Sequence, residues 1–296
     1  MNRLAVIVPA VNTLGDLLGC LAALGRERED VELEVLVVNR LGAAAAAAVR
    51  VEAPWVRVLQ VAPELAIPQM RALAFREAKS EAVAVIEDHV IVPRGWAKRL
   101  LAGLAAGHPV VGGAVANAAT ETLLDWACFL CEYSHCLPPL PAGEVEWLTG
   151  NNILYQRALL AKHLGLLDAG HWENSLHDAL RAEGVPLWCD PEIVIGHKKH
   201  YTFSEYFSQR FLYARSYAGA RVAAAGAARK FAMGAAAFAL PPLLFARTVS
   251  RILAKGRHTE KLWPSLPLIA LFVLAWGFGE VVGYWFGAGD SLARVK

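Results

Sequence analysis

Cysteine is scarce in this sequence, and its net charge is small. The chain has five cysteines among 296 residues, and so few cysteines in an odd number argue against the disulfide framework of a small secreted domain. We therefore expect a reducing compartment. The formal net charge is only +2, and no basic stripe with interleaved aromatic residues occurs, so a nucleic-acid partner is not expected.

Glycine-rich nucleotide motifs are also missing. Gly42 and the alanines that follow it lack the glycine spacing of a dinucleotide or P-loop fingerprint, which disfavours a dinucleotide dehydrogenase and a P-loop NTPase. No repeat of solenoid length is visible. No basic segment with an apolar core and a cleavage site precedes the first apolar run, residues 4–8, so we expect the N-terminal part to stay in the cytoplasm.

Hydrophobic residues are abundant, and their excess lies near the C-terminal end. They make up 56% of the chain, above the roughly half that is usual in soluble proteins. Residues 268–287 carry one charge, Glu280, and are long enough to cross a hydrocarbon core of about 30 Å, so they predict a transmembrane helix. Residues 231–246 are shorter and contain Pro241 and Pro242, which predicts either a kinked span or an interfacial helix.

Between these two segments lie cations that prefer the cytoplasm or anionic headgroups, so the topology stays open. They are Arg247, Arg251, Lys255, Arg257 and Lys261. Composition therefore predicts two domains, residues 1–228 and residues 229–296, of which the second associates with the membrane through one or two spans.

Apolar runs alternate with helical patterns in the first domain. We expect strands at residues 4–8, 35–38, 56–61, 82–89, 110–113 and 192–195, and helices at 14–24, 68–78, 96–106 and 123–136 and from about 157 and 173. Strand, helix and strand at this spacing need a right-handed crossover. The pattern predicts an α/β fold with a mostly parallel, Rossmann-like sheet flanked by helices.

One apolar strand ends in three ionisable side chains. Residues 82–89 read AVAVIEDH, so Glu87, Asp88 and His89 follow a buried strand at the edge where open α/β sheets bind ligands. Two carboxylates and an imidazole placed together are costly to bury unless a divalent cation or a ligand offsets the cost. We interpret them as a metal site that clamps a diphosphate. The alternative is a solvated acidic turn before Pro93.

Two later segments are ambiguous when taken alone. The turn at residues 149–152 contains Asn151 and Asn152, whose amides can bind sugar hydroxyls or simply satisfy the turn geometry. Glu173 lies in the first turn of an expected helix, where the helix dipole favours a carboxylate without any catalytic role.

Taken together, these segments resemble the family 2 glycosyltransferases, which have the GT-A fold, over residues 4–221. The resemblance rests on five segments in the family's order: VIVPAVN, EVLVVNR, RALAFREAKSEAVAVIEDHVIVPRGW, TGNNILYQRALL and HWENSLHDALRAEG. They are similar to the first strand with its Pro-Thr-Tyr-Asn turn, the second strand, the approach to the Asp-x-Asp motif, the Gly-x-Asn segment and the Glu-Asp helix. The apolar C-terminal segment is typical of a membrane-anchored bacterial type.

The resemblance implies a nucleotide-sugar donor, a divalent metal (Mn²⁺ or Mg²⁺) on its diphosphate, and transfer to an acceptor hydroxyl with inversion. Glu87 and His89 occupy the outer positions of the Asp-x-Asp motif. His197, in GHKKH, resembles a late histidine that many members add to the metal shell, although it can also be a polar residue of a basic loop. A histidine at position 89 favours a softer ion such as Mn²⁺.

The remaining site residues also follow from the resemblance. The expected donor-binding residues are Pro9, Asn39, Arg71 and Asp88, and the expected acceptor- or sugar-binding residues are Gly150, Asn151, Asn152 and Trp172. The family's base is ordinarily the second residue of the Glu-Asp motif, which is Asn174 here, so Glu173 is the substitute base or else an acceptor ligand. Asn39 stands where relatives place an aspartate that contacts the nucleotide base.

The Gln-x-x-Arg-Trp motif of processive synthases is missing. We therefore expect a single sugar transfer from a nucleotide-sugar to a lipid-linked or glycan acceptor, carried out by a cytoplasmic catalytic domain on the inner membrane. The departures at Asn39, His89 and Asn174 leave an alternative, a GT-A-like binding or scaffold protein with impaired catalysis.

Overall fold

The chain forms two compact units, each built from two segments. The computed structural model describes residues 2–295. The first unit contains the residues up to Ala118 together with Cys136–Lys198, and the second contains Ala119–His135 and the residues from Lys199 onward. The division at residue 228 expected above concerns membrane association rather than packing, and it stays a prediction.

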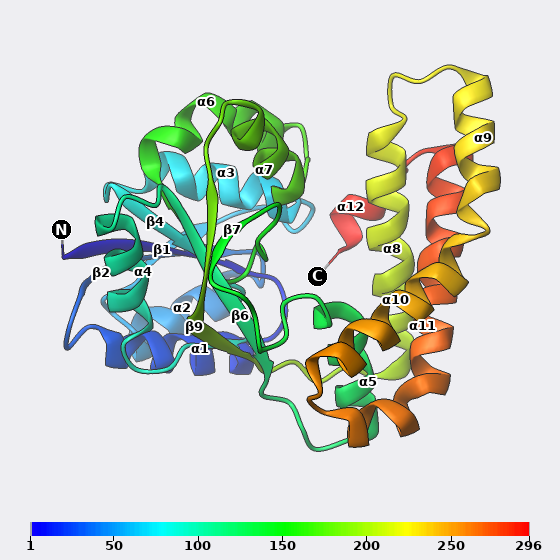
Figure 1. Ribbon diagram of the computed structural model, residues 1–296. Coiled ribbons are helices and arrows are strands. Elements are labelled where there is room, and N and C mark those ends of the chain that lie inside the picture. The colour runs from blue at the N-terminus through cyan, green and yellow to red at the C-terminus, as the bar shows by residue number, and fades with distance from the viewer. Residues whose placement is uncertain (1, 296) are drawn as a thin grey trace. The chain divides into compact units, whose positions relative to one another are not determined.

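Within residues 2–295, a sheet of nine strands forms the core of the first unit (Figure 1). Its parallel half has the order β3-β2-β1-β4 and consists of β1 (Arg3–Ala10), β2 (Glu32–Asn39), β3 (Arg57–Gln60) and β4 (Ala82–Val85). β1, β4 and the second half of β2 read as nearly continuous apolar runs because both faces of the sheet are covered there, whereas β3 at the edge is only half-buried. The sequence predicted all four, and the structure confirms them.

Among the described strands of the sheet, six run in one direction, in keeping with the expected mostly parallel sheet, and three run against them. β8 (Ile153–Gln156) runs antiparallel to both β4 and β6 (Val110–Asn117), and β9 (Leu187–His197) runs parallel to β6. Two short strands, β5 (Val90–Ile91) and β7 (Gly143–Val145), pair antiparallel with β9. Strands of two or three residues are too short to show an alternation of apolar and polar side chains, so the sequence does not predict them.

Helices cover both faces of this sheet. Figure 1 shows α3 (Ile67–Glu77), α6 (Arg157–Asp168) and α7 (Glu173–Ala182) on one face, with α1 (Leu14–Glu27) and α2 (Ala43–Glu52) on the other. α4 (Trp96–Ala105) packs against β6 and β9. Thr13 caps α1, since its hydroxyl accepts a hydrogen bond from the backbone N–H of Asp16. The α/β class is confirmed.

The second unit is helical in the part of the chain that is described. It consists of α5 (Leu123–Tyr133), α8 (Phe203–Arg221), α9 (Ala227–Ala237), α10 (Leu240–Lys255), α11 (Thr259–Phe286) and α12 (Ser291–Arg294). α11 lies at its centre and packs against α5, α8, α9 and α10. α11 is the most apolar of these helices, which explains why it takes the central position.

α11 is long and apolar enough to cross a membrane, judged by length and composition. Half of its most apolar window is buried against the neighbouring helices. The opposite face exposes Leu271, Leu274, Phe278 and Trp285 at helical spacing. This stripe leaves one apolar face of α11 uncovered by the other described residues.

Glu280, the single charge of the predicted span, has partners within its own unit. Arg221 Nη1 lies 3.3 Å from Glu280 Oε2, and Trp276 Nε1 donates to Glu280 Oε1 at 2.9 Å. Arg221 also donates to the hydroxyl of Tyr284 at 3.0 Å. These contacts satisfy the requirement that a carboxylate in an apolar helix be paired.

Small residues set the distance between α8 and α11. A Cβ atom at Gly279 would lie 2.4 Å from the backbone oxygen of Phe211, and one at Gly283 would lie 2.6 Å from that of Arg215. The two glycines are four residues apart and therefore lie on one face of α11. This spacing of small residues allows close approach of backbones, as it does between transmembrane helices.

α9 and α10 meet at an angle of 51°. Pro241 and Pro242 stand in the first turn of α10, where a missing backbone N–H does no harm, but they cannot continue a helix that begins earlier. The prolines therefore explain the bend. Taken together, the two helices are long and apolar enough to form one broken membrane span or a re-entrant pair.

Candidate functional site

The acidic segment after β4 forms a tight turn between two strands. β4 ends at Val85, and the backbone N–H of Ile86 still bonds to the oxygen of Ile7 on β1 at 3.1 Å. The chain then turns, with the N–H of Val90 bonded to the oxygen of Glu87 at 3.1 Å. β5 follows at once and pairs with β9, so that Val90 stands opposite His197. This pairing places His89 beside His197.

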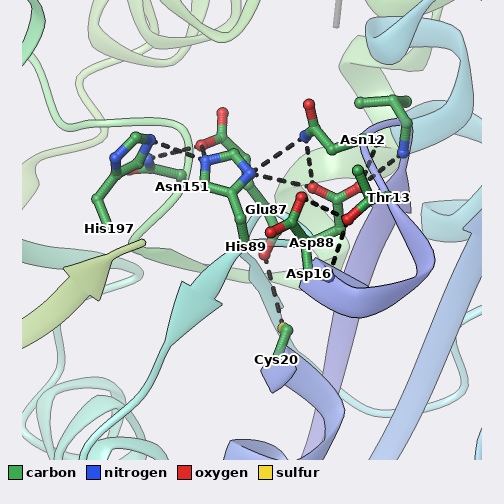
Figure 2. Close-up of polar contacts among 10 residues, drawn as sticks. Asn12, Thr13, Asp16, Cys20, Glu87, Asp88, His89, Asn151 and His197 are labelled. Atoms are coloured by element: carbon green, nitrogen blue, oxygen red, sulfur yellow. Dashed lines mark hydrogen bonds and ion pairs between the residues drawn. The ribbon is translucent and has the colours of Figure 1, made fainter. Parts of the chain in front are cut away.

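Glu87, His89 and His197 point toward one another (Figure 2). Their three ligand atoms all lie within 4.8 Å of one another. His89 Nε2 is 2.8 Å from His197 Nε2 and 3.3 Å from Glu87 Oε2. Two imidazole nitrogens this close need a proton or a cation between them, because two lone pairs repel. The three residues that the sequence assigned to the metal therefore come together.

The geometry and the chemistry of these donors fit a divalent metal. Two ligands at right angles, each about 2.1 Å from an ion, lie about 3 Å apart, close to the separation of the two imidazole nitrogens. Two imidazoles and one carboxylate suit Mn²⁺ and other first-row ions better than Mg²⁺, which prefers an all-oxygen shell. The arrangement also argues against a solvated acidic turn, because His89 and Asp88 are buried.

Asp88 holds this turn in place. Its carboxylate accepts hydrogen bonds from the backbone N–H groups of Val11 and Asn12, at 2.7 and 2.8 Å, and from the side-chain amide of Asn12 at 2.6 Å. It also lies 3.0 Å from His89 Nδ1. A carboxylate that accepts from Nδ1–H leaves Nε2 free to bind a metal and fixes the ring orientation.

These contacts change the expected role of Asp88, which is completely buried. Its oxygens are occupied by protein donors, so a direct contact with the donor substrate, as expected above, is not available to it. Asp88 instead joins the β1–α1 loop to the turn that carries His89, a positioning role. Sequence reasoning missed Asn12 as the partner in this contact, although its place directly after the first strand was visible.

The electrostatics of the turn require a positive charge. Burial alone would lower the pKa of His89, but hydrogen bonds to Asp88 and Glu87 and their charges outweigh burial and raise it to about 9. Burial would raise the pKa of Glu87, yet the hydrogen bond and charge of His89 hold it well below its usual range. A protonated ring or a bound cation therefore balances the carboxylates at this position.

Asn151 supports Glu87 rather than facing open space. Its side-chain Nδ2 donates to Glu87 Oε2 at 2.9 Å, and its Oδ1 accepts from the hydroxyl of Thr149 at 2.7 Å. The amide is buried. Asn151 thus orients the carboxylate of the candidate metal site. Because its side-chain amide already contacts Glu87 and Thr149, the contact with sugar that we expected from the sequence stays a prediction.

Asn152 has a structural role, which corrects its assignment as a sugar-binding residue. Its Nδ2 donates to the backbone oxygens of Ala114 and Ile193, at 2.8 and 3.0 Å, and its Oδ1 accepts from Trp96 Nε1 at 3.0 Å. The side chain is 0% exposed. All of its donors are used to tie β8 to β6 and β9, so none is left for a ligand.

Glu173 and Arg71 form a buried ion pair. Arg71 Nη1 lies 2.7 Å from Glu173 Oε2, and the two side chains are 5% and 16% exposed. Gly150 faces the same carboxylate, since a Cβ atom there would lie 2.5 Å from Glu173 Cδ. Burial would lower the pKa of Arg71, but the charges of Glu173 and Glu87 raise it. Arg71 thus connects Glu173 electrostatically with the metal cluster.

Beside this pair lies a buried hydrogen bond that the sequence did not reveal. The hydroxyl of Tyr155, on β8, is 2.8 Å from His177 Nε2, on α7. Both side chains are buried, and His177 Nδ1 finds no hydrogen-bond partner among residues 2–295. Burial lowers the pKa of His177 to about 4, although the charges of Glu173 and Asp178 oppose this shift.

We expect His177 to make stability depend on pH. Above pH 6.5 the ring is neutral in both the folded and the unfolded chain. Between pH 6.5 and pH 4, the ring binds a proton in the unfolded chain but stays neutral in the folded chain. Stability is therefore lost as pH falls from 6.5 toward 4, by up to about 3 kcal/mol. Thermal unfolding of His177→Gln should show a smaller loss between pH 7 and pH 4.5 than the unaltered chain. Parallel losses would contradict the assignment.

The other predicted donor-binding residues are less accessible than expected. Asn39 donates through Nδ2 to Gly42 O and Gln60 Oε1, at 2.8 and 2.7 Å, and accepts from the N–H of Leu41 at 3.0 Å. Pro9 is buried within β1, in register with Val38. The side chain of Asn39 therefore stabilises the turn after β2. Its predicted contact with a nucleobase stays a prediction.

Trp172 caps the start of α7 without a side-chain hydrogen bond and is buried. With 6% of its surface exposed, the side chain packs inside the unit, and its assignment to sugar or acceptor stays a prediction. Of the residues assigned to sugar or acceptor, Gly150 lies against the carboxylate of Glu173 and Asn151 donates to that of Glu87.

Comparison with known proteins supports the fold. No protein-family model matches the chain, and no curated protein matches it in sequence. Among solved structures it is similar to the mannosyltransferase PcManGT from Pyrobaculum calidifontis in complex with GDP-Man and Mn²⁺, with 17% identity, a TM-score of 0.62 and coverage of 96% of this chain and 87% of that one.

A second solved structure is that of S. aureus TarS, at 16% identity and a TM-score of 0.46, covering 72% of this chain and 39% of that one. A similarity this weak carries no argument. The likeness to PcManGT shows that the chain has the fold of a glycosyltransferase structure. At such low identity it shows the fold alone, and the chemistry must be argued from the site.

Proposed function

We propose that this chain is a metal-dependent GT-A glycosyltransferase, related to family 2, that transfers a sugar from a nucleotide-sugar donor to a lipid-linked or glycan acceptor. The observation that carries the proposal is the convergence of Glu87, His89 and His197. In a glycosyltransferase fold, that convergence lies after β4, where the strand ends and a ligand can approach. The proposed reaction is inverting and non-processive.

The proposed metal is Mn²⁺, with Mg²⁺ as the weaker substitute. When bound, the ion would act as a Lewis acid that stabilises the negative charge of the departing nucleoside diphosphate. Glu87, His89 and His197 would hold it, Asp88 would orient His89, and Asn151 would orient Glu87. The solved complex of PcManGT contains Mn²⁺ and GDP-Man, which supports the same pairing of ion and donor here.

Glu173 is the proposed base, and its ion pair with Arg71 bears on when it can act. A carboxylate paired with a buried guanidinium is a weak base, since the positive charge favours its ionised form. Arg71 is also the proposed ligand of the donor diphosphate, and the two roles compete for one guanidinium. We expect the diphosphate to draw Arg71 away and to free Glu173 for the acceptor hydroxyl.

The proposed location is the cytoplasmic face of the inner membrane, with α11 as the anchor. Its exposed stripe and its length support this. A catalytic domain held at a membrane favours an acceptor that is itself lipid-linked.

Replacing Glu173 tests the proposed reaction. Glu173→Gln keeps the shape of the side chain but cannot accept a proton, so we expect the turnover number for transfer to fall by a factor of about 100 to 10,000. Because the neutral amide competes less strongly for Arg71, donor affinity should stay the same or rise. The measurement is release of nucleoside diphosphate from a panel of nucleotide-sugars with Mn²⁺. Asp178→Asn removes an exposed carboxylate from the same helix and should leave turnover unchanged.

The second candidate is a GT-A-like binding or scaffold protein. It is favoured by the amide at position 174, whose buried Oδ1 finds no partner among the described residues, and by the pairing of Glu173 with Arg71. Calorimetry separates the two. Binding of a nucleotide-sugar with Mn²⁺ but no turnover with any acceptor would favour the scaffold, whereas turnover lost in Glu173→Gln supports the enzyme.

A further inference from the structure

Large exposed apolar side chains gather on one of the two units. Among residues 2–295, every large hydrophobic side chain that is exposed, apart from Val51, belongs to the second unit. α9 exposes Phe231, α10 exposes Leu243 and Leu253, and Phe238 is exposed at the junction between the two helices. Leu243 is 59% exposed and Leu253 is 43% exposed. Water does not favour such a surface, so a lipid phase is the simplest cover for it.

α10 also carries a row of cations. Arg247, Arg251 and Lys255 follow one another at intervals of four residues and therefore form one line along the helix. The neighbouring positions Thr248 and Ile252 are buried in the unit. The line of cations thus runs along the edge between the buried face of α10 and its exposed apolar face, as in helices that lie in a membrane interface.

The row of cations converges on the end of α5. Lys255 Nζ donates to the backbone oxygen of His135 at 3.2 Å. Burial lowers the pKa of His135 to about 3, and the charges that act most strongly on its ring are four cations, the three of α10 and Arg210. Four cations that act on one position make a strongly positive site, which attracts a further anion.

Arg210, on α8, completes the cluster. Its guanidinium stacks on the ring of Trp276, 4.2 Å from the centroid, and lies 5.9 Å from that of Tyr206. Its Nε is buried and finds no hydrogen-bond partner among the described residues. Glu132 lies close enough to add one negative charge near Arg210. Aromatic stacking fixes the guanidinium plane, which preorganises it for a phosphate.

We propose that Arg210, Arg247, Arg251 and Lys255 form a binding site for the headgroup phosphate of an anionic phospholipid. The cations supply the charge, and the apolar side chains beside them, Leu243 and Leu253, supply a surface for the acyl chains. The occupant is a lipid rather than a free anion because the charged line borders exposed apolar residues. This site favours an interfacial position for the bent pair of α9 and α10. It does not rest on the proposed catalytic activity.

The test uses the full chain in neutral detergent. Dihexanoyl phosphatidylglycerol should raise the thermal unfolding temperature more than dihexanoyl phosphatidylcholine, and native mass spectrometry should show the first lipid retained. Replacing Arg247, Arg251 and Lys255 by glutamine should weaken the apparent affinity for phosphatidylglycerol about fivefold per charge, and the preference should fall with salt. The matched control is Arg50→Gln, Arg94→Gln and Lys98→Gln, which removes three exposed cations of the first unit.

Each outcome decides the proposal. A preference for phosphatidylglycerol that the triple variant loses and the control keeps supports it. Equal stabilisation by the two lipids would overturn it, because charge would then not matter. Stabilisation of the same size by inorganic phosphate would also overturn it, in favour of a free-anion site. The single variant Arg251→Gln serves where the triple variant does not fold.

Discussion

His89→Ala is expected to lower metal-dependent turnover of a nucleotide-sugar by about a thousandfold. The ring supplies one of the three converging ligand atoms, and its Nε2 is 2.8 Å from His197 Nε2. Without it, two ligands remain and the ion binds weakly. In the unaltered chain, Mn²⁺ at about 100 times its dissociation constant should stabilise the fold by about 2.7 kcal/mol. The variant should lose this stabilisation, as thermal unfolding with and without Mn²⁺ will show.

Glu87→Gln is the conservative companion of this variant. It removes the charge but keeps an oxygen that can accept from Asn151 Nδ2, so the fold should be preserved. The matched control is Glu192→Gln, which changes an exposed carboxylate on β9, the strand that carries His197. Full turnover and full Mn²⁺ stabilisation in both His89→Ala and Glu87→Gln would refute the metal site.

The double variant Gly279→Ala/Gly283→Ala should lower the free energy of unfolding of the second unit by about 4 kcal/mol. Each added methyl would stand within 2.4 to 2.6 Å of a backbone oxygen of α8, which cannot move aside as a flexible side chain can. The helices must separate to accept it. Tryptophan fluorescence during unfolding of the full chain in detergent measures the effect.

The control makes the same chemical change where the helix has room. A Cβ atom at Gly165, on α6, would meet nothing within 4 Å, so Gly165→Ala should be neutral or stabilising by up to about 1 kcal/mol, because alanine favours helix. Opposite signs in α6 and α11 are therefore expected. A shift of equal sign and size at both places would mean that the close approach of α8 and α11 does not limit stability.

The parallel half of the sheet could be predicted from the sequence because β1, β2 and β4 contain apolar runs bounded by turn residues, and β3 lies in a segment that mixes apolar and polar residues. β8 could not, since the residues ILYQ follow directly on a polar turn and their direction is set by β4 and β6. β5 has two residues and exists as a strand only because β9 lies beside it. The mixed character of the sheet follows from these two pairings, which no local pattern contains.

The candidate metal cluster shows the same limit. Glu87 and His89 were predicted because ionisable residues after a buried strand are unusual, and His197 because of the family resemblance. The roles of Asn151 and Asn152 could not be told apart from the sequence. The two amides are adjacent and chemically alike, but Asn151 contacts Glu87 and Asn152 contacts the backbone of neighbouring strands. The pairing of Arg71 with Glu173 joins residues that the sequence holds far apart. The spacing of Gly279 and Gly283 is typical of close helix packing, but we did not predict this contact from the sequence.

The antiparallel pairing of β5 with β9 has a consequence for biosynthesis. His89 and His197 are 108 positions apart, so a growing chain on the ribosome exposes the first long before the second has been made. The strand with His197 must emerge and dock before both imidazoles can hold the proposed ion. Uptake of the proposed cation would then be a late step of maturation, and a chain that stops short of this strand should remain apo however much metal the cell supplies.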